Sequence, residues 1–450
     1  MAANSIRAII ATRDDARVAD DPTLRLLSAP MSRFQIASVV MIFMLCALDG
    51  FDVMTITYAA PALLAEWSID KAQMGYVLSA GLFGMAIGSF TLAPLADVFG
   101  RRKMVLVLLA VMVAGTFWTA AAEGIGALAA SRVLTGLGIG AMIGTVVPLA
   151  AEYSNARYRD RAVSLATMGY GIGAVVGGFV SAGLLASFGW RSVFIFAGTV
   201  GAIMICFVWR SLLEPFAVIV AKPGRNGLAR ANEYLRRCGH PPVTELPLAS
   251  TVQFPVLSLF NREMLRGTLL LTAIYACYMI PQFYLQTWLP TLVVDAGFSP
   301  SRAAMVSSVL MAGGICGGLF IAASSLRVGL KQLEVVLLVG AILMPVALTL
   351  LSGSFRVLMI GALVAGFFVM GTMIGLNAII ARTFPAHLRA SGAGLVMGVG
   401  RLASAVPPAL AGRLFTAGFD SVTVALVMSA PAVLSLALLM IFEVRPSTTA

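Results

Sequence analysis

Two aspartates lie inside a stretch of the chain that is otherwise apolar enough for hydrocarbon. Residues 45–56 read LCALDGFDVMTI, which places Asp49 and Asp52 three positions apart. That spacing puts both carboxyl groups on one face of a helix. A charge at the centre of a bilayer costs about 3 kcal/mol on insertion scales, so an acid at this depth indicates a functional site. Burial favours the protonated form of a carboxyl group, which is what a proton carrier requires.

The other ionisable residues lie closer to water. Of the 20 acidic residues, we place all except these two in tails, loops or helix ends. Both histidines, His240 and His387, fall in loops on the predicted cytoplasmic side, which excludes a histidine relay within the membrane. Any proton coupling is therefore assigned to Asp49 and Asp52.

Arg132 is the cation predicted to lie beside Asp49. The segment that holds the acids starts near Arg33, so Asp49 lies about 24 Å along it at roughly 1.5 Å per residue. Arg132 lies in the first two turns of a segment that runs in the opposite direction, so the two can share an outer level. Two acids facing one cation leave a carboxyl group free to titrate. The alternative is a structural salt bridge.

The elements that must position these residues are predicted from hydrophobicity. The chain has 450 residues, of which 59% are hydrophobic and only 11% charged, whereas soluble domains contain about 25% charged residues. Long continuous apolar runs exclude a β-barrel, whose strands alternate apolar and polar residues. We predict an all-α membrane protein with twelve transmembrane helices in two six-helix bundles. The predicted segments are approximately 34–58, 73–96, 103–122, 126–150, 162–186, 191–213, 267–289, 302–325, 332–352, 356–381, 390–414 and 421–442.

The net charge of +11 reports topology. We place 24 of the 31 Lys and Arg residues in the two tails and in the loops of one side, five in or near the opposite loops and two in segment eleven. This asymmetry predicts that both termini are cytoplasmic and argues against a nucleic-acid partner. The N-terminus is polar and has no apolar core of a signal peptide. The five dispersed cysteines do not suggest a metal site or a disulfide framework.

A polar stretch divides the chain into halves. Within it, GLARANEYLRRCG could form an amphipathic helix at the cytoplasmic surface, although the favoured interpretation is a basic connector that only follows the topology. The sequences of the two halves are weakly similar, which suggests a duplication with substrate held between them near the midplane. The predicted organisation is an N-terminal tail (1–33), a six-helix bundle (34–213), a connecting loop (214–266), a second six-helix bundle (267–442) and a C-terminal tail (443–450).

A charged loop follows the second segment. It reads PLADVFGRRKMVL and resembles the signature GxLADrxGRkxxl of the major facilitator superfamily, which its Asp97, Gly100, Arg101 and Arg102 match. The resemblance implies that Asp97 and Arg101 lock the cytoplasmic side closed, with Glu152 as their partner. An ion pair at helix ends suits a gate because its strength depends on the helix positions.

Two further motifs narrow the resemblance. The DGFD stretch is similar to the DGxD mark in the first helix of the aromatic acid:proton symporters, and Asp49, Gly50 and Asp52 match it. The loop EYSNARYR resembles that family's EYxPxRxR, with Asn155 in place of the proline. Ala174 stands where antiporters of the superfamily usually have proline, which favours uptake over export.

A carboxylate substrate would need a cation in the cavity. Arg401 lies about 12 residues into segment eleven, hence roughly 18 Å deep, and a guanidinium binds a carboxylate with two hydrogen bonds. The resemblance also implies a functional arginine there. Tyr275, Tyr278 and Gln282 in segment seven could contact a ring that bears a hydroxyl, and Asn377 in segment ten is a further candidate. An aromatic belt or plain helix packing is the alternative for these four residues.

The predicted function is import of small aromatic carboxylates with protons, by alternating access, across the inner membrane. The expected partners are the substrate, protons and the lipid bilayer, the expected state is a monomer, and no cofactor or metal is expected. The alternatives are proton-driven export of organic compounds and a sensor that binds aromatic acids without transporting them. An enzyme is excluded, because no nucleophile–base pair, metal cluster or phosphate loop is found.

Overall fold

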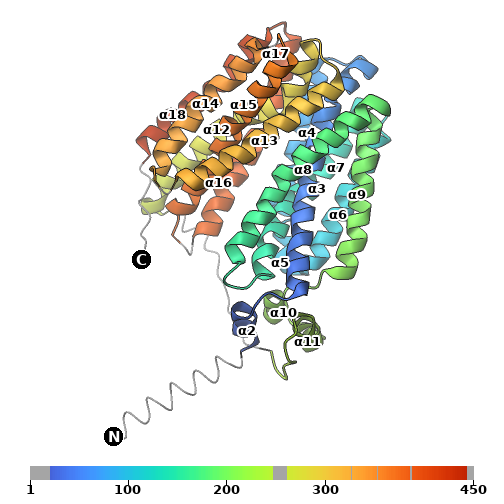
Figure 1. Ribbon diagram of the computed structural model, residues 1–450, viewed down its shortest axis with the longest axis vertical. Helices are drawn as coiled ribbons and strands as arrows, with labels where there is room; N and C mark the ends of the chain where they lie inside the picture. The colour runs from blue at the N-terminus through green and yellow to red at the C-terminus, as the bar shows by residue number, and fades with distance from the viewer. Residues whose placement is uncertain (1–20, 247–260, 326, 352, 386–387, 443–450) are drawn as a thin grey trace.

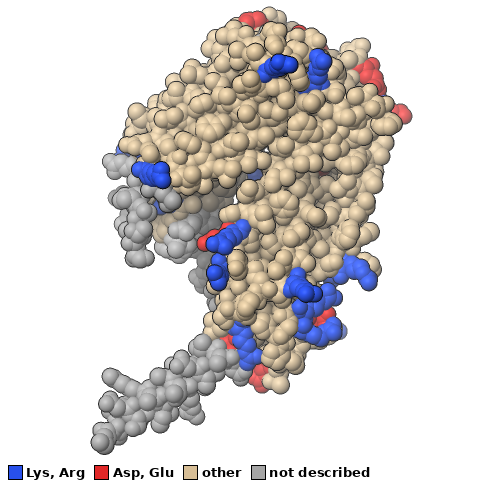
Figure 2. Space-filling model, viewed as in Figure 1, with Lys and Arg blue, Asp and Glu red and all other residues tan. Residues whose placement is uncertain are grey.

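The computed structural model describes residues 21–246, 261–325, 327–351, 353–385 and 388–442, and these residues contain helices and no strand. Twelve spans are long and apolar enough to cross a membrane, which confirms the predicted fold class. The helices form two bundles that approach each other at one end and diverge toward the other (Figure 1). Much of the surface between the charged ends is uncharged (Figure 2). His387 and the tails 1–20 and 443–450 lie outside the described residues.

Each bundle supplies six spans. Those of the first are α3 (Arg33–Trp67), α4 (Lys71–Thr91), α6 (Arg101–Ala120), α7 (Ile125–Glu152), α8 (Arg159–Ser187) and α9 (Trp190–Ser211). Those of the second are α12 (Arg262–Asp295), α13 (Pro300–Ser324), α14 (Leu330–Leu350), α15 (Phe355–Thr383), α16 (Arg389–Ser404) with α17 (Val406–Thr416), and α18 (Ser421–Ile441). The shorter helices are α2 (Pro22–Ser28), α5 (Leu95–Phe99), α10 (Phe216–Ala221) and α11 (Gly227–Cys238).

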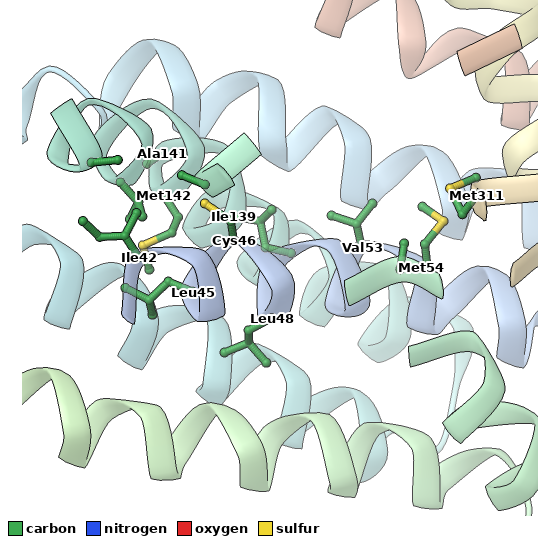
Figure 3. Close-up of a cluster of buried hydrophobic side chains, with 14 of the residues drawn as sticks. Ile42, Leu45, Cys46, Leu48, Val53, Met54, Ile139, Ala141, Met142 and Met311 are labelled. Carbon is green, nitrogen blue, oxygen red and sulfur yellow. The ribbon is translucent and has the colours of Figure 1, made fainter. Parts of the chain in front are cut away.

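The helix that carries the two aspartates runs through the middle of the first bundle. Apolar side chains of α3, among them Ile42 and Leu45, pack in one cluster with Ile139 and Met142 of α7 (Figure 3). Every residue from 48 to 61 is buried. The aspartates therefore lie within the apolar interior of the protein.

Glycine allows α8 to approach α3 closely at the aspartates. A Cβ atom at Gly50 would lie 2.9 Å from the Cα of Tyr170 and closer still to its carbonyl oxygen, so any larger residue would push the helices apart. Small residues at such contacts are how helices approach one another within a membrane. Gly50 therefore brings Tyr170 of α8 beside the aspartate pair.

Segment eleven is divided into two helices. α16 ends at Ser404, and α17 begins with Val406 and continues through Pro407 and Pro408. Proline has no N–H and fits the first turn of a helix but not its interior. The break between α16 and α17 therefore lies next to these prolines, whereas Pro148 lies inside the continuous helix α7.

The described part of the connecting loop packs against the first bundle. Helices α2, α10 and α11 lie together at the end of this bundle where α5 is found (Figure 1). The apolar face of α11 includes Tyr234, whose ring lies 6.2 Å from that of Tyr153 and 5.6 Å from that of Phe34. The amphipathic helix therefore forms, but its apolar face is covered by protein. The segment 247–260 lies outside the described residues.

Candidate functional site

Asp52 lies against two other helices of its own bundle. Its side chain is 1% exposed and accepts a hydrogen bond of 3.1 Å from the Thr116 hydroxyl of α6. The Arg132 guanidinium of α7 donates to the backbone carbonyl of Asp52 at 3.5 Å. We expected Arg132 at the level of Asp49, and it lies instead beside Asp52. The difference is three residues, which is about 4.5 Å along a helix.

Asp49 is buried without a hydrogen bond. It is 1% exposed, and among the described residues neither of its carboxylate oxygens has a partner. The charges that act on it are those of Asp52 and of Arg401 in the second bundle. The two aspartates thus have different surroundings: Asp52 has Thr116 and Arg132, and Asp49 has the field of Arg401.

Arg401 joins the two bundles. Its Nη1 donates to the carbonyl oxygen of Gly140 on α7 at 3.2 Å. The groups that interact with it electrostatically include Asp49 and the hydroxyl groups of Tyr170 and Tyr275. A Cβ atom at Gly400 would overlap the Tyr275 ring, so the absence of a side chain there lets the ring lie against α16. A carboxyl group, a guanidinium and two phenols therefore meet between the bundles.

The other predicted substrate contacts divide into two groups. The Tyr278 hydroxyl donates to the carbonyl oxygen of Val369 inside the second bundle, so it is engaged in helix packing. The Gln282 amide contacts the sulfurs of two methionines on α15, the nearer at 3.2 Å, and its carbonyl oxygen has no partner among the described residues. The side-chain oxygen of Asn377 also has no hydrogen-bond partner among the described residues.

Two polar residues near Arg401 were absent from the predicted site. Tyr170 of α8 is hydrogen-bonded to Gln286 of α12, and the Gln286 amide also contacts the Met54 sulfur across the bundles at 3.3 Å. Both side chains lie on apolar segments, and Gln286 is four residues from Gln282. The signal that could have identified them is a polar side chain within an apolar segment. The sequence of one helix does not show, however, whether such a side chain points toward the other bundle.

A third buried acid corrects the predicted placement of the acidic residues. Glu334 was assigned to a helix end and is the fifth residue of α14, but its side chain is 0% exposed. Neither carboxylate oxygen has a hydrogen-bond partner in the part of the chain that the structure describes. Position along the sequence was correct, whereas burial depends on how α14 packs against its neighbours.

The predicted gate residues meet at the end of the first bundle. Arg101 lies 3.0 Å from Glu152 and 3.4 Å from Asp97, measured between the charged atoms. The chain turns at Gly100 with φ of 96°, a conformation that favours glycine. The whole cluster belongs to α5, α6 and α7, and no ion pair among the described residues links it to the second bundle.

Glu214 of the connecting loop completes this cluster. It is 7% exposed and accepts hydrogen bonds from the backbone N–H groups of Arg101 at 2.5 Å and Arg102 at 3.3 Å. These are the first N–H groups of α6, where a negative charge is favourable. Arg102 also donates to the carbonyl oxygen of Trp209 at 2.5 Å. A residue more than one hundred positions away therefore fixes the turn that carries Arg101.

The two bundles are in contact at the opposite end. The Lys71 ammonium lies 2.7 Å from the Asp295 carboxylate. The N–H of Ala409 donates to the Ser79 hydroxyl at 3.0 Å. Gly75 lies against the carbonyl of Pro408, where a side chain would collide. This end is closed, and a small pocket beneath it is lined by Arg132 together with residues of α3, α4, α7 and α12.

Comparisons with known proteins agree with this architecture. A model of the Major Facilitator Superfamily matches residues 42–408. Among solved structures, a bacterial homologue of the human lysosomal transporter Spinster, in an inward-facing and occupied conformation, has a TM-score of 0.70 and 15% identity, covering 92% of this chain and 97% of that chain. At this identity the likeness shows the fold.

Curated relatives cover most of the chain. It is 31% identical over 385 residues to a 4-hydroxybenzoate transporter of Acinetobacter baylyi, which is 83% of each protein. It is 29% identical over 392 residues to a gallate transporter of Pseudomonas putida, covering 86% of this chain and 87% of the relative. These names confirm the narrower resemblance of the DGFD stretch. The chain is a multi-pass membrane protein and belongs to the Major Facilitator Superfamily.

Proposed function

We propose that the chain imports small aromatic carboxylates together with protons across the inner membrane, as a monomer with both termini in the cytoplasm. The observation that carries the proposal is the position of Asp49, a buried carboxyl group that has no hydrogen-bond partner among the described residues and lies within the field of Arg401 of the other bundle. The names of the relatives support the substrate class, since they include transporters of 4-hydroxybenzoate, gallate and benzoate.

Arg401 is the proposed anchor of the substrate carboxylate. Its guanidinium can form two parallel hydrogen bonds with a carboxylate, which fixes the orientation of the ring. Tyr275 and Tyr170 lie beside Arg401 and offer aromatic faces and hydroxyl groups. Gln286, which is hydrogen-bonded to Tyr170, can serve a ring hydroxyl. Gln282 and Asn377 are kept as further contacts, because the side-chain oxygen of each has no partner in the part of the chain that the structure describes.

Coupling follows from competition for Arg401. An ionised Asp49 neutralises the guanidinium and competes with the substrate anion. A protonated Asp49 leaves the guanidinium to the substrate, so proton and anion bind together. Linkage makes the effect reciprocal, and a bound anion raises the proton affinity of the site by the same factor. Asp52, beside Thr116 and Arg132, is the neighbouring group that passes the proton on.

Alternating access is assigned to the two ends of the bundles. With the N-terminus in the cytoplasm, the closed contact of Lys71 and Asp295 lies on the outer side and the diverging end faces the cytoplasm. The Arg101 cluster, with Asp97, Gly100, Arg102 and Glu152, would then lock the cytoplasmic side when the second bundle approaches it in the other conformation. Such a change repacks interfaces between rigid bodies.

The test is transport of 4-hydroxybenzoate in proteoliposomes that contain the purified protein. We expect accumulation driven by an imposed pH gradient, and counterflow without one. Asp49→Asn should abolish accumulation and keep counterflow, because exchange does not require net proton release. Glu123→Gln, a change of an exposed acid in the loop after α6, is the matched control. Accumulation by Asp49→Asn at the wild-type level would refute the coupling scheme, and outward flux under the same gradient would instead support an exporter.

A further inference from the structure

Glu334 is a carboxyl group that the transport scheme does not use. It lies in α14 of the second bundle, about 6 Å from the start of the helix at roughly 1.5 Å per residue. Asp49, by comparison, lies in α3 of the first bundle. The two acids are thus on different helices and in different halves, and Glu334 needs its own explanation.

The neighbours that the structure gives Glu334 carry no positive charge. Gly375 of α15 lies against the carboxyl group, and a Cβ atom built at Gly375 would also lie 3.3 Å from the Cδ1 atom of Ile321 on α13. Tyr278 of α12 acts on Glu334 at longer range. Lys331 on its own helix is turned away, since its ammonium donates to the carbonyl oxygens of Met440 and Phe442 at 2.8 and 2.7 Å. Among the described residues, no arginine or lysine charge acts on Glu334.

The carboxyl group of Glu334 lies directly against Gly375. A Cβ atom at this position would overlap the Oε2 atom of Glu334 and would lie 2.9 Å from its Cδ. The carboxyl group therefore rests against the backbone of α15 where that helix has no side chain. A protonated carboxyl group is neutral and can lie against an apolar helix surface, whereas a carboxylate brings a charge that no described group balances.

The charge state follows from the same contacts. An ionised carboxylate in an apolar site without a cation or a donor is strongly disfavoured, and the group takes up a proton instead. Ionisable residues within membrane spans most often mark ion or proton pathways. The route to water is short, because the exposed residues 327–329 lie about one and a half to two helical turns before Glu334.

We propose that Glu334 is a second proton-binding site, which holds a proton while its carboxyl group is enclosed against Gly375 and releases it when water reaches the group during the transport cycle. Its ligand is H⁺, and the release step leaves a carboxylate that water reaches from the nearby helix end. The release during transport rests on the proton coupling proposed above, whereas the protonated state of Glu334 does not. One proton with a monoanion moves no net charge, so a second proton would make uptake respond to the membrane potential.

Infrared spectroscopy of the purified full-length protein tests the protonated state. The spectrum of the wild type minus that of Glu334→Gln at neutral pH should contain the C=O stretch of one protonated carboxylic acid. The control Glu123→Gln should give a carboxylate difference instead, because that side chain is exposed. A carboxylate difference for Glu334→Gln would overturn the proposal. Glu334→Leu, which is apolar and suits the same site, serves as a second variant that removes the proton.

The charge carried per substrate tests the release. Uptake of 4-hydroxybenzoate into proteoliposomes is measured at a series of membrane potentials and pH gradients, and the reversal potential gives the charge per substrate. We expect Glu334→Gln and Glu334→Leu to carry one charge fewer than the wild type, with counterflow within about twofold. An unchanged charge would overturn the release step. If the wild type itself shows no proton-driven flux, the proposed function fails, and the infrared result still decides whether Glu334 carries a proton.

Discussion

The closed end of the two bundles combines an ion pair with a close backbone contact, and their contributions can be separated. The Lys71 and Asp295 side chains are 2.7 Å apart but 32% and 39% exposed. Gly75 of α4 faces α17 of the other bundle, where a Cβ atom would collide with the carbonyl oxygen of Pro408 and lie 3.2 Å from the Cα of Ala409. Both contacts exist only while this end is closed.

The expected magnitudes differ. An exposed ion pair contributes about 0.2–1 kcal/mol, so Lys71→Ala should shift the closed–open equilibrium by no more than about fivefold. Overpacking of a tight contact costs about 1–3 kcal/mol, which corresponds to roughly a 5- to 150-fold shift for Gly75→Ala. The penalty falls on the closed state alone, because Gly75 and Pro408 belong to different bundles. A perturbation shifts a population only by such a difference between states.

The assay is the labelling rate of a cysteine placed in the pocket beneath the closed end. Thr287 lines this pocket, so Thr287→Cys in right-side-out vesicles reports how often a membrane-impermeant maleimide reaches it from outside. The parent protein with its five cysteines gives the blank. Gly75→Ala combined with Thr287→Cys should label at least five times faster than Thr287→Cys alone. Lys71→Ala in the same background should give a smaller increase.

Gly126→Ala is the matched control for this measurement. It lies near the start of α7, and a Cβ atom there would meet nothing within 4 Å. Combined with Thr287→Cys, it should label at the same rate as Thr287→Cys alone. Equal labelling rates for Gly75→Ala and Gly126→Ala would refute the assignment of the closed contact. A larger effect of Lys71→Ala than of Gly75→Ala would refute the predicted ranking of the two free energies.

Three further substitutions follow from contacts within one bundle. Gly50→Ala should destabilise the protein by about 1–3 kcal/mol, because the new methyl group collides with Tyr170; an unfolding midpoint equal to that of the wild type would contradict this. Glu214→Gln removes a charge-assisted hydrogen bond worth about 1.5–3 kcal/mol from the start of α6 at Arg101, so amide exchange there should accelerate, and unchanged protection would exclude the capping role. Tyr278→Phe should lower stability by about 1 kcal/mol and leave the Kd for 4-hydroxybenzoate within about twofold; a large loss of affinity would show that the hydroxyl contacts substrate.

The gate residues were expected from the resemblance of one loop to the superfamily signature, and the contacts among them are local. Asp97, Gly100 and Arg101 lie in one loop, and their ion pairs form as the loop turns. Glu152 joins them because the ends of antiparallel neighbours meet on one side of the bundle. The transmembrane spans follow in the same way from composition, since a run of apolar residues of sufficient length must cross the bilayer as a helix.

The parts of the site that the sequence did not predict depend on how the helices are rotated and paired. The contact of Tyr170 with Gln286 joins segments that are more than one hundred residues apart. The burial of Glu334 depends on the position of Gly375 on another helix. Helical periodicity assigns side chains to one face of their own helix, but it does not say which helix covers that face.

The sequence by itself determined the membrane class, the twelve spans, the charged loop and the presence of two acids at a depth where charge is unfavourable. Only the tertiary structure decided that Asp52 lies beside Arg132 while Asp49 faces Arg401, and that a third acid is enclosed in the second bundle. The physical reason is that hydrophobicity and helix period act within a segment. The partner of a buried charge is chosen by close packing between segments, which glycines such as Gly50 and Gly375 permit.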